Sequence, residues 1–235
     1  VWEGDELKRV IPAIERLAAS GAAISVDTRR VAVMEAGLAA GAHLINDVSA
    51  LRHDPRSLEV AARAGVPVVL MHAPGPADDL HADGAYRDVA LDVFDWLKAR
   101  RDAALAAGIA RERIILDPGI GFGKSVAENL SLINALPLFH ALGQPLLVGA
   151  SRKRMIGALS NEAPAHQRLG GSLALAVKAL EAKGIKLDGP VRTDADLHAL
   201  IELKNRANNR SRVVAGYCWK WPSKMPMVTA TRTWT

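Results

Sequence analysis

The sequence contains very little cysteine, no long uninterrupted apolar stretch and no basic leader, and each shortage excludes a class of protein. One cysteine in 235 residues cannot build a disulfide framework or a thiolate zinc site, which favours a reducing, cytoplasmic setting. The longest uncharged run, residues 129–151, is interrupted by prolines and polar side chains and does not predict a membrane span. The first residues are acidic, unlike a secretory signal. We expect no membrane partner, and because the sequence opens without Met we expect it to be an excerpt of a longer protein.

Charge is distributed unevenly along the chain, whose net charge is +5. Residues 1–187 hold 22 Lys and Arg against 21 Asp and Glu, whereas residues 188–235 hold eight against four, together with three of the five tryptophans. Because the basicity belongs to the tail, the body gives no reason to expect a nucleic-acid partner. The shift in composition predicts a boundary near residue 187, between a body (1–187) and an unassigned basic, Trp-containing tail (188–235).

Short apolar runs alternate with longer amphipathic ones through the body, which predicts an α/β fold with a parallel sheet. The apolar content of 49% is enough for a sizeable core. The predicted strands cover residues 22–26, 43–45, 66–71, 114–116 and 145–149, with a weaker sixth at 184–187. The predicted helices cover residues 5–19, 30–40, 56–64, 86–107, 127–141 and 164–183.

Polar residues follow nearly every predicted strand, and this decides between a doubly wound sheet and a barrel. Asp27, Asn46, His72, Asp117 and Ser151 each stand at the carboxyl end of a strand or directly after it. A doubly wound sheet gathers ligand contacts at one switch point, whereas all strand ends of a barrel face a common centre. A complete barrel of this kind has eight strands. The five to six βα units therefore predict an incomplete (β/α)8 TIM barrel, with two leading units missing.

The most informative segment is residues 115–124, where Asp117 ends a buried strand and Gly119, Gly121 and Gly123 precede Lys124. Glycines at alternate positions permit a tight loop and a close approach of a ligand. The spacing matches neither a phosphate-binding P-loop nor a dinucleotide fingerprint. The simplest structural interpretation is a glycine-rich turn with a solvated carboxylate, and the functional one is a ligand site.

A second segment, residues 147–153, places a hydroxyl and two cations (Ser151, Arg152 and Lys153) directly after a buried strand. In barrels this is the face where anions and carbonyl oxygens bind, although surface basic residues at a strand exit would look the same. Asp27 and Asn46 are individually weak signals, because such residues often cap the next helix. The histidines show no ligand spacing, so we expect no metal site made by protein side chains alone.

Taken in order, one motif per strand, these segments resemble dihydropteroate synthases, enzymes of folate biosynthesis. The motifs are Ser-Val-Asp-Thr, Ile-Asn-Asp-Val-Ser, Leu-Met-His, Asp-Pro-Gly-x-Gly-Phe-Gly-Lys and Gly-x-Ser-Arg-Lys. The resemblance runs over residues 1–187 and includes the helix phrase at 170–174. Gly-Phe-Gly-Lys and Ser-Arg-Lys are the specific pieces; without them other pterin-binding barrels, including corrinoid-linked methyltransferases, would match equally well.

The resemblance implies a transferase that joins p-aminobenzoate to 6-hydroxymethyl-7,8-dihydropterin pyrophosphate, giving dihydropteroate and releasing pyrophosphate. It implies that Asp117 binds the 2-amino/N3 edge of the pterin with Asn46 alongside, and that Met71 lies against the ring. Lys153 is expected to donate to the ring carbonyl and N5, and Asp27 to lie near the reacting carbon. These two residues are the expected catalytic pair.

The same resemblance implies further contacts and partners. Ser151, with the helix that follows it, is expected to hold the carboxylate of p-aminobenzoate, and Arg152, Gly121 and Phe122 are expected to line the substrate site. Mg²⁺ is the implied cofactor, and a homodimer is the usual assembly.

The sequence departs from the family pattern at both ends. Counterparts of the first two strands, which carry Mg²⁺ and pyrophosphate contacts in the family, are missing, and residues 184–193 contain Arg192 but no His at the family's Arg-x-His spacing. We therefore expect this chain alone to have little or no synthase activity. The alternatives that remain open are a non-catalytic pterin-binding remnant and a methyltransferase-type pterin-binding domain.

The tail does not continue the family pattern. Residues 193–204 can form a capped helix and residues 212–221 a strand-like run, and basic residues interleaved with aromatics could bind single-stranded nucleic acid. A fusion whose tail binds nucleic acid is thus the alternative of another class, and a frame-disrupted end is a further one. We also expect the first strand (22–26) and the last (near 187) to present unpaired edges that promote self-association.

Overall fold

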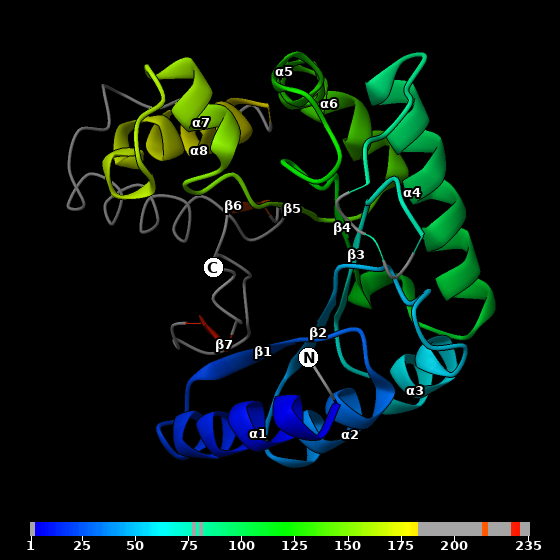
Figure 1. Ribbon diagram of the computed structural model, residues 1–235. Coiled ribbons are helices and arrows are strands. Elements are labelled where there is room, and N and C mark those ends of the chain that lie inside the picture. The colour runs from blue at the N-terminus through cyan, green and yellow to red at the C-terminus, as the bar shows by residue number, and fades with distance from the viewer. Residues whose placement is uncertain (1–2, 77–78, 80–81, 183–212, 216–226, 231–235) are drawn as a thin grey trace.

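In the computed structural model the chain forms one curled parallel sheet with helices on its outer side (Figure 1). The structure describes residues 3–76, 79, 82–182, 213–215 and 227–230. The predicted α/β class and the incomplete barrel are confirmed, because successive parallel strands curve around a common centre as the walls of a TIM barrel do.

Successive strands of the body, β1 to β5, pair in parallel with one another. Asp27 lies opposite Asn46 on the next strand, and Met71 lies opposite Asp117. The order across the described sheet is β6-β5-β4-β3-β2-β1-β7. The strands are β1 (Ala23–Asp27), β2 (Leu44–Asp47), β3 (Val68–Met71), β4 (Ile114–Asp117), β5 (Leu146–Val148), β6 (Val213–Ala215) and β7 (Met227–Ala230).

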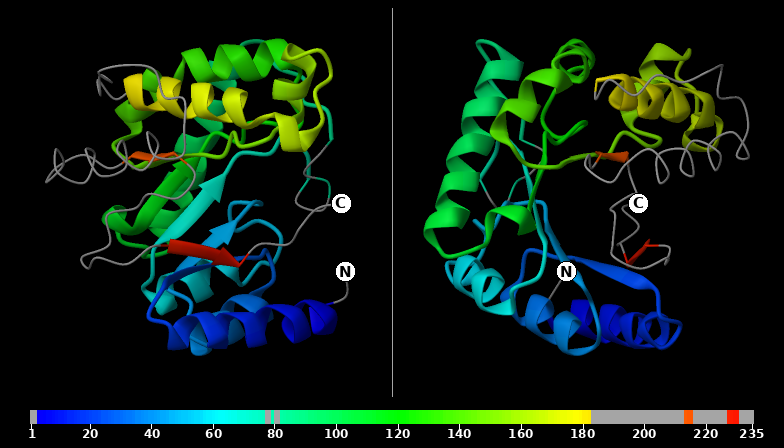
Figure 2. Two further views of the ribbon diagram at one scale, coloured as in Figure 1. Left: turned by 90° about the vertical axis from the view of Figure 1, so that its left-hand side faces the viewer. Right: turned by 180° about the vertical axis from the view of Figure 1, so that it is seen from behind.

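The helices connect successive strands and cover the outer face of the sheet (Figure 2). Their ends follow local chemistry: Asp88 caps α4 by accepting from two backbone N–H groups, and Ser125 with Glu128 forms a capping box at α5. The α-helices are α1 (Glu3–Ala19), α2 (Val31–Ala39), α3 (Ser57–Ala64), α4 (Val89–Ala106), α5 (Val126–Asn134), α6 (Leu136–Phe139), α7 (Arg154–Leu159) and α8 (Leu169–Glu181). No helix among the described residues is long and apolar enough to cross a membrane.

The helix boundaries differ from the sequence-based expectation at three places. The single helix predicted over 127–141 is divided into α5, α6 and a 3-10 turn, with Pro137 in the first turn of α6. The helix predicted from residue 164 begins at Leu169, because residues 165–167 form a 3-10 turn. The short helix α7 was not predicted. The weak strand at 184–187 lies outside the described residues.

The edges of the five body strands are paired, which corrects the expectation that β1 presents an open edge. β7 pairs in parallel with β1 over four residues, and β6 pairs with β5 over three. Both of these strands come from the tail. Backbone pairing by the tail therefore satisfies main-chain groups that would otherwise be free templates for association.

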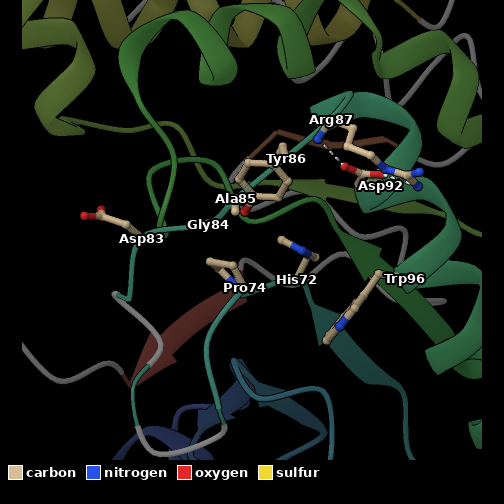
Figure 3. Close-up of a pocket in the computed structure, with 9 residues that line it drawn as sticks. All are labelled: His72, Pro74, Asp83, Gly84, Ala85, Tyr86, Arg87, Asp92 and Trp96. Carbon is tan, nitrogen blue, oxygen red and sulfur yellow. Dashed lines mark hydrogen bonds and ion pairs between the residues drawn. The ribbon is translucent and has the colours of Figure 1, made fainter.

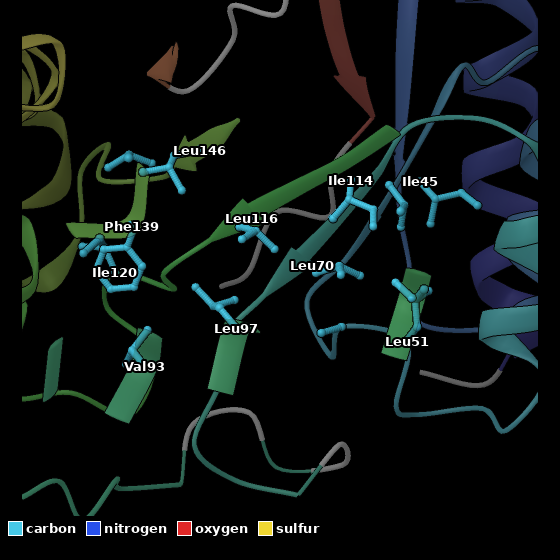
Figure 4. Packing of buried hydrophobic residues seen from close by; sticks show 14 of the residues in the cluster. Ile45, Leu51, Leu70, Val93, Leu97, Ile114, Leu116, Ile120, Phe139 and Leu146 are labelled. Carbon is cyan, nitrogen blue, oxygen red and sulfur yellow. The ribbon is translucent and has the colours of Figure 1, made fainter. Parts of the chain in front are cut away.

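Residues alternate between the two faces of the sheet, and the alternation separates the core from the barrel interior. Outward-facing residues pack with the helices in one large core, part of which is drawn in Figure 4 (Ile45, Leu70, Ile114, Leu116 and Leu146 among them). The residues between them face inward and form a separate small apolar layer of Leu44, Val69 and Ile115, with Leu147 against it. The next inward positions, toward the carboxyl ends of the strands, are mostly polar.

Candidate functional site

Four of the predicted site residues lie at the carboxyl ends of neighbouring strands. Each comes two residues after a member of the inner apolar layer or of the β1 face, so the period of two along a strand directs its side chain inward. The four residues are Asp27 on β1, Asn46 on β2, Met71 on β3 and Asp117 on β4. The ladder registers place Asp27 opposite Asn46 and Met71 opposite Asp117, and the second pair lies two residues farther along the sheet, because Asn46 is opposite Val69. The strand mouths therefore converge on a common centre, as predicted.

Asp27 and Asn46 form the first pair of the site. The Asn46 amide donates to Asp27 Oδ2 at 3.3 Å, and the two residues are directly opposite in the β1–β2 register. Burial, and to a smaller extent the nearby Asp47 carboxylate, raise the pKa of Asp27 to about 7, against the opposing effect of the Asn46 hydrogen bond. Asp27 therefore changes charge near neutral pH.

Asp117 is buried at the mouth of β4, and the glycine loop follows it. The Gly119 N–H donates to Asp117 Oδ1 at 2.7 Å. Burial raises the pKa of Asp117 to about 6, while the Gly119 hydrogen bond and the charges of Lys153 and Lys124 act in the opposite direction. A carboxylate between two cations and with little competing water is suited to accept hydrogen bonds from N–H groups of a ligand.

Lys153 reaches this centre from the turn after β5. Its ammonium lies 4.3 Å from the centroid of the Phe122 ring, and its stem lies so close to Gly121 that a Cβ there would be 2.9 Å from Lys153 Cδ. Burial lowers the pKa of Lys153, and the charges of Asp117 and Asp27 raise it. The glycine loop thus supports a partly desolvated cation that faces two carboxylates.

Met71 and Phe122 supply the apolar part of the site. Met71 packs with Ala73, and Val48 and Phe122 lie against this pair. An apolar surface beside a buried carboxylate and a cation matches a planar ring with polar edges.

Ser151 and Arg152 lie in the same turn as Lys153 but are exposed at the rim. The Arg152 backbone has a positive φ of 54° and is held by Ser172 Oγ, which accepts from Arg152 N at 2.9 Å, and by Arg168, which donates to the Arg152 carbonyl. The substrate contacts predicted for these two side chains stay predictions.

Two residues that hold the glycine loop were not predicted as site members. The Lys124 ammonium lies 3.0 Å from each of Gly119 O, Phe122 O and His72 Nδ1. The buried Asn129 side chain accepts from Gly121 N at 2.7 Å and donates to two carbonyls at the start of α5. Lys124 stood inside the Gly-Phe-Gly-Lys motif, which was a usable signal, whereas Asn129 lies in a helix with no such mark.

Asp47 also ends a strand, but its role is structural. Its carboxylate faces outward and accepts from Ser49 N, Ser49 Oγ and Leu51 N. These bonds hold a turn in which Ala50 and Leu51 have positive φ angles of 53° and 59°. Asp47 therefore stabilises the turn between β2 and α3.

A pocket of about 380 Å³ lies beside the site along the connection from β3 to α4 (Figure 3). Aromatic rings form much of its wall, with an ion pair between Arg87 and Asp92 at 3.9 Å on one side. None of the nine predicted site residues lines it. The pocket is connected to the glycine loop by His72, which contacts Lys124, and by Tyr86 and Gly84, which donate to the Gly123 carbonyl. The lining residues are His72, Pro74, Asp83, Gly84, Ala85, Tyr86, Arg87, Asp92 and Trp96.

The described part of the chain contains no group of side chains that would coordinate the predicted Mg²⁺. No three His, Cys, Asp or Glu side chains there lie close enough to hold a metal ion. The donor set therefore does not fit a metal held by the protein alone, and no chemical step is derived through one.

Comparison with known proteins agrees with the resemblance to dihydropteroate synthases over residues 1–187. The family model described as "Pterin binding enzyme" matches residues 1–187. The dihydropteroate synthase of Escherichia coli (strain K12) is 45% identical over 174 residues, which are 74% of this chain and 61% of that protein. The chain thus spans about three fifths of the length of the curated relatives it matches.

Solved structures resemble the described fold as well. A dihydropteroate synthase from Xanthomonas albilineans in complex with 7,8-dihydropteroate has a TM-score of 0.72 and 46% identity, covering 77% of this chain and 68% of that one. A structure of the same species' enzyme with 4-aminobenzoic acid has a TM-score of 0.76 and 41% identity, covering 89% of this chain and 77% of that one.

Proposed function

The chain belongs to the pterin-binding enzyme family, and from that premise we propose that its inner face binds a dihydropterin for the dihydropteroate synthase reaction. In that reaction the amine of p-aminobenzoate attacks the CH2 group of 6-hydroxymethyl-7,8-dihydropterin pyrophosphate. A C–N bond forms, the C–O bond to pyrophosphate breaks, and the amine loses a proton. The presence of 7,8-dihydropteroate and 4-aminobenzoic acid in the Xanthomonas structures supports this assignment.

The observation that carries the proposal is the pairing of a buried carboxylate with a half-buried cation across an apolar surface. A pterin presents N–H donors on its 2-amino/N3 edge and acceptors at its carbonyl and N5. Asp117 can accept from the first edge, and Lys153 can donate to the second. Met71 and Phe122 supply the apolar contact. Each edge of the ring thus meets a group of the opposite hydrogen-bonding type.

Asp27 has the position suited to the chemical step. Its carboxylate lies on the strand next to Asn46, which orients it by a hydrogen bond. When it is ionised, a carboxylate near the CH2 group stabilises the positive charge that develops as pyrophosphate leaves. Because its pKa is about 7 in the ligand-free protein, this contribution grows as the pH rises through neutrality. Asp27 and Lys153 are therefore the proposed catalytic residues.

Ser151 and Arg152, exposed at the rim beside Lys153, are the groups proposed for the carboxylate of p-aminobenzoate. Their position next to the pterin-binding cation supports this, because the two substrates must meet at one carbon atom. We further propose, from the resemblance, a homodimer in the cytoplasm. No step is assigned to Mg²⁺, and comparing turnover in Mg²⁺ with turnover in a chelator tests the family requirement.

The test is dihydropteroate formation by the full chain from the two substrates, followed by mass spectrometry. Lys153→Met is expected to lower the yield at least tenfold, because it removes the donor to the ring carbonyl. Lys98→Met is the matched control, since Lys98 is an exposed residue of α4, and it should match the unsubstituted chain.

Pterin binding without product formation would agree with the low turnover expected from the departures at both ends of the sequence, and it would identify a non-catalytic pterin-binding protein. Absence of pterin binding in the folded chain would remove the assignment of the inner face altogether.

A further inference from the structure

Lys124 directs all of its hydrogen bonds to the frame of the site rather than to the proposed ligand position. Its ammonium has three N–H donors, and three acceptors lie at 3.0 Å: Gly119 O, Phe122 O and His72 Nδ1. This number of acceptors matches the charged form of lysine. No donor is left for a substrate, so Lys124 cannot act as a binding group in this arrangement.

Two of the three acceptors are carbonyls of a single turn. Gly119 O also accepts from Phe122 N at 3.2 Å, so residues 119–122 form a closed turn. Gly119 and Gly121 adopt positive φ angles of 70° and 82°, which few other residues would adopt. The convergence of two carbonyl oxygens is unfavourable without a cation between them. Lys124 supplies that cation.

The other side of the same turn carries the proposed ligand contacts. Gly119 N donates to the Asp117 carboxylate at 2.7 Å. Gly121 and Phe122 form the surface along which the Lys153 side chain lies. A change in the turn would therefore move both the carboxylate and the cation that are proposed to bind the pterin.

His72 completes the arrangement from the neighbouring strand. Because Lys124 donates to Nδ1, the imidazole proton must be on Nε2 when the ring is neutral. Burial, followed by the charges of Lys124 and Arg52, lowers the pKa of His72 to about 3. The ring lies edge-on to Trp96 with centroids 4.9 Å apart and forms a wall of the pocket in Figure 3. The lysine thus joins the β3 end to the β4 loop.

We infer that Lys124 is a positioning residue, whose half-buried ammonium fixes the Gly119–Phe122 turn against His72 and so aligns Asp117 and Lys153 for the pterin. The inference rests on the proposed function for its ligand, and on the described contacts for its geometry. The charged groups that surround Lys124 are Asp117 and Glu128, which favour its ammonium form, and Lys153, which opposes it. Burial lowers the pKa of Lys124 to about 7.

The test compares three variants of the full chain: Lys124→Met, Lys124→Gln and, as the matched surface control, Lys98→Met. Lys124→Met removes both the donors and the charge. Lys124→Gln keeps two N–H donors without the charge, and it is the second variant if Lys124→Met does not fold. The first readout needs no ligand and follows the ¹⁵N signals of His72 and the ¹³Cε signal of Lys153 by NMR.

In the ligand-free protein we expect Lys124→Met to raise the pKa of His72 and to shift the Lys153 signal, since both neighbours lose their fixed geometry. Lys124→Gln is expected to raise the pKa of His72 but to leave the Lys153 signal near its original position, because the turn keeps hydrogen bonds. Unchanged His72 and Lys153 signals in either folded variant would overturn the inference, whether or not the protein binds a pterin.

The second readout is the affinity for 6-hydroxymethyl-7,8-dihydropterin from pH 5 to 8. Lys124→Met is expected to lower it at least tenfold, with Lys124→Gln in between and Lys98→Met unchanged. Because the Lys124 charge lowers the pKa of Asp117, the pH at which binding declines should move upward in both Lys124 variants. Equal loss at every pH would show a merely structural role and overturn the inference. Absence of binding by the unsubstituted chain would instead reject the proposed function.

Discussion

At the scale of single residues, the inner face holds two carboxyl groups whose charged form is disfavoured by burial. Burial raises the pKa of Asp27 to about 7 and that of Asp117 to about 6, so both carboxylates resist ionisation without a ligand. A ligand that donates hydrogen bonds to them removes part of this cost. The site therefore favours binding at the expense of the stability of the empty protein.

The first prediction concerns the pH dependence that Asp27 gives to stability. Its pKa is raised from 3.8 to about 7 on folding, so its stabilising contribution is complete below about pH 4 and is lost as the pH rises through 7. Asp27→Asn should remove this dependence and make the ligand-free protein more stable near pH 8, on the order of 1.4 kcal/mol for each unit of pKa shift.

The measurement for Asp27→Asn is urea unfolding of both proteins at pH 5 and pH 8. Asp95→Asn, at an exposed position of α4, is the control and should not alter the pH dependence. A difference in stability between the Asp27→Asn variant and the original protein that is the same at both pH values would show that Asp27 is not perturbed by burial.

Some residues of the site could be predicted from the sequence because they stand at the ends of strands. Strand ends are visible in a sequence, and the period of two makes the side chains of Asp27, Asn46, Met71 and Asp117 converge. The functions of Lys124 and Asn129 could not be predicted in this way, because they depend on the path of a loop. Most of their partners are backbone atoms, which carry no sequence signal.

At the scale of elements, the glycine turn after β4 determines how the site is assembled. Gly119 has a φ of 70°, and a Cβ at this position would collide with the His72 carbonyl oxygen. A substitution there must therefore displace either the turn or the end of β3. The conformation of the glycine turn therefore affects the ends of both β3 and β4 at the site.

The second prediction is that Gly119→Ala destabilises the protein by at least about 1 kcal/mol, the usual cost of a left-handed conformation for a residue with a Cβ, and abolishes most pterin binding. Gly170→Ala is the matched control, since a Cβ at Gly170 meets no atom within 4 Å and Ala favours helix. Urea unfolding and calorimetric titration measure the two effects. Wild-type affinity in Gly119→Ala would disprove the constraint.

The extent of the elements was less predictable than their existence. Hydrophobic runs identified all five body strands because parallel strands covered on both faces are continuously apolar. The boundary between α5 and α6 depends on tertiary packing, because the side chains of Leu136 and Phe139 are buried. The short α7 has too few residues to show a period.

At the scale of the whole molecule, the tail contributes strands to the sheet. β7 and β6 lie on the two edges of the body strands, beside β1 and β5 (Figure 1). This pairing could not be predicted from the sequence, because the partner and register of a short strand are set by the sheet edge on which it pairs. The sequence predicts only a strand-like run at 212–221, which contains β6.

The third prediction is that removal of residues 213–235 uncovers both edges and causes self-association. Free strand edges are templates for pairing with other chains. Light scattering after size-exclusion chromatography should show a larger, concentration-dependent mass for the shortened chain than for the full one. Val228→Pro, which disrupts only the pairing of β7 with β1, should have a smaller effect in the same direction. Identical masses at all concentrations would show that the tail strands do not protect the edges.

The central claim is that Asp117 and its neighbours on the inner face bind the pterin, and isothermal titration calorimetry with 6-hydroxymethyl-7,8-dihydropterin at pH 7.5 tests it most directly. Asp117→Asn replaces an acceptor-only carboxylate by an amide and should weaken binding by roughly 1.5–3 kcal/mol, the scale of a hydrogen bond to a charged group. Asp95→Asn should bind like the unsubstituted chain. An unchanged Kd in a folded Asp117→Asn variant would contradict the account.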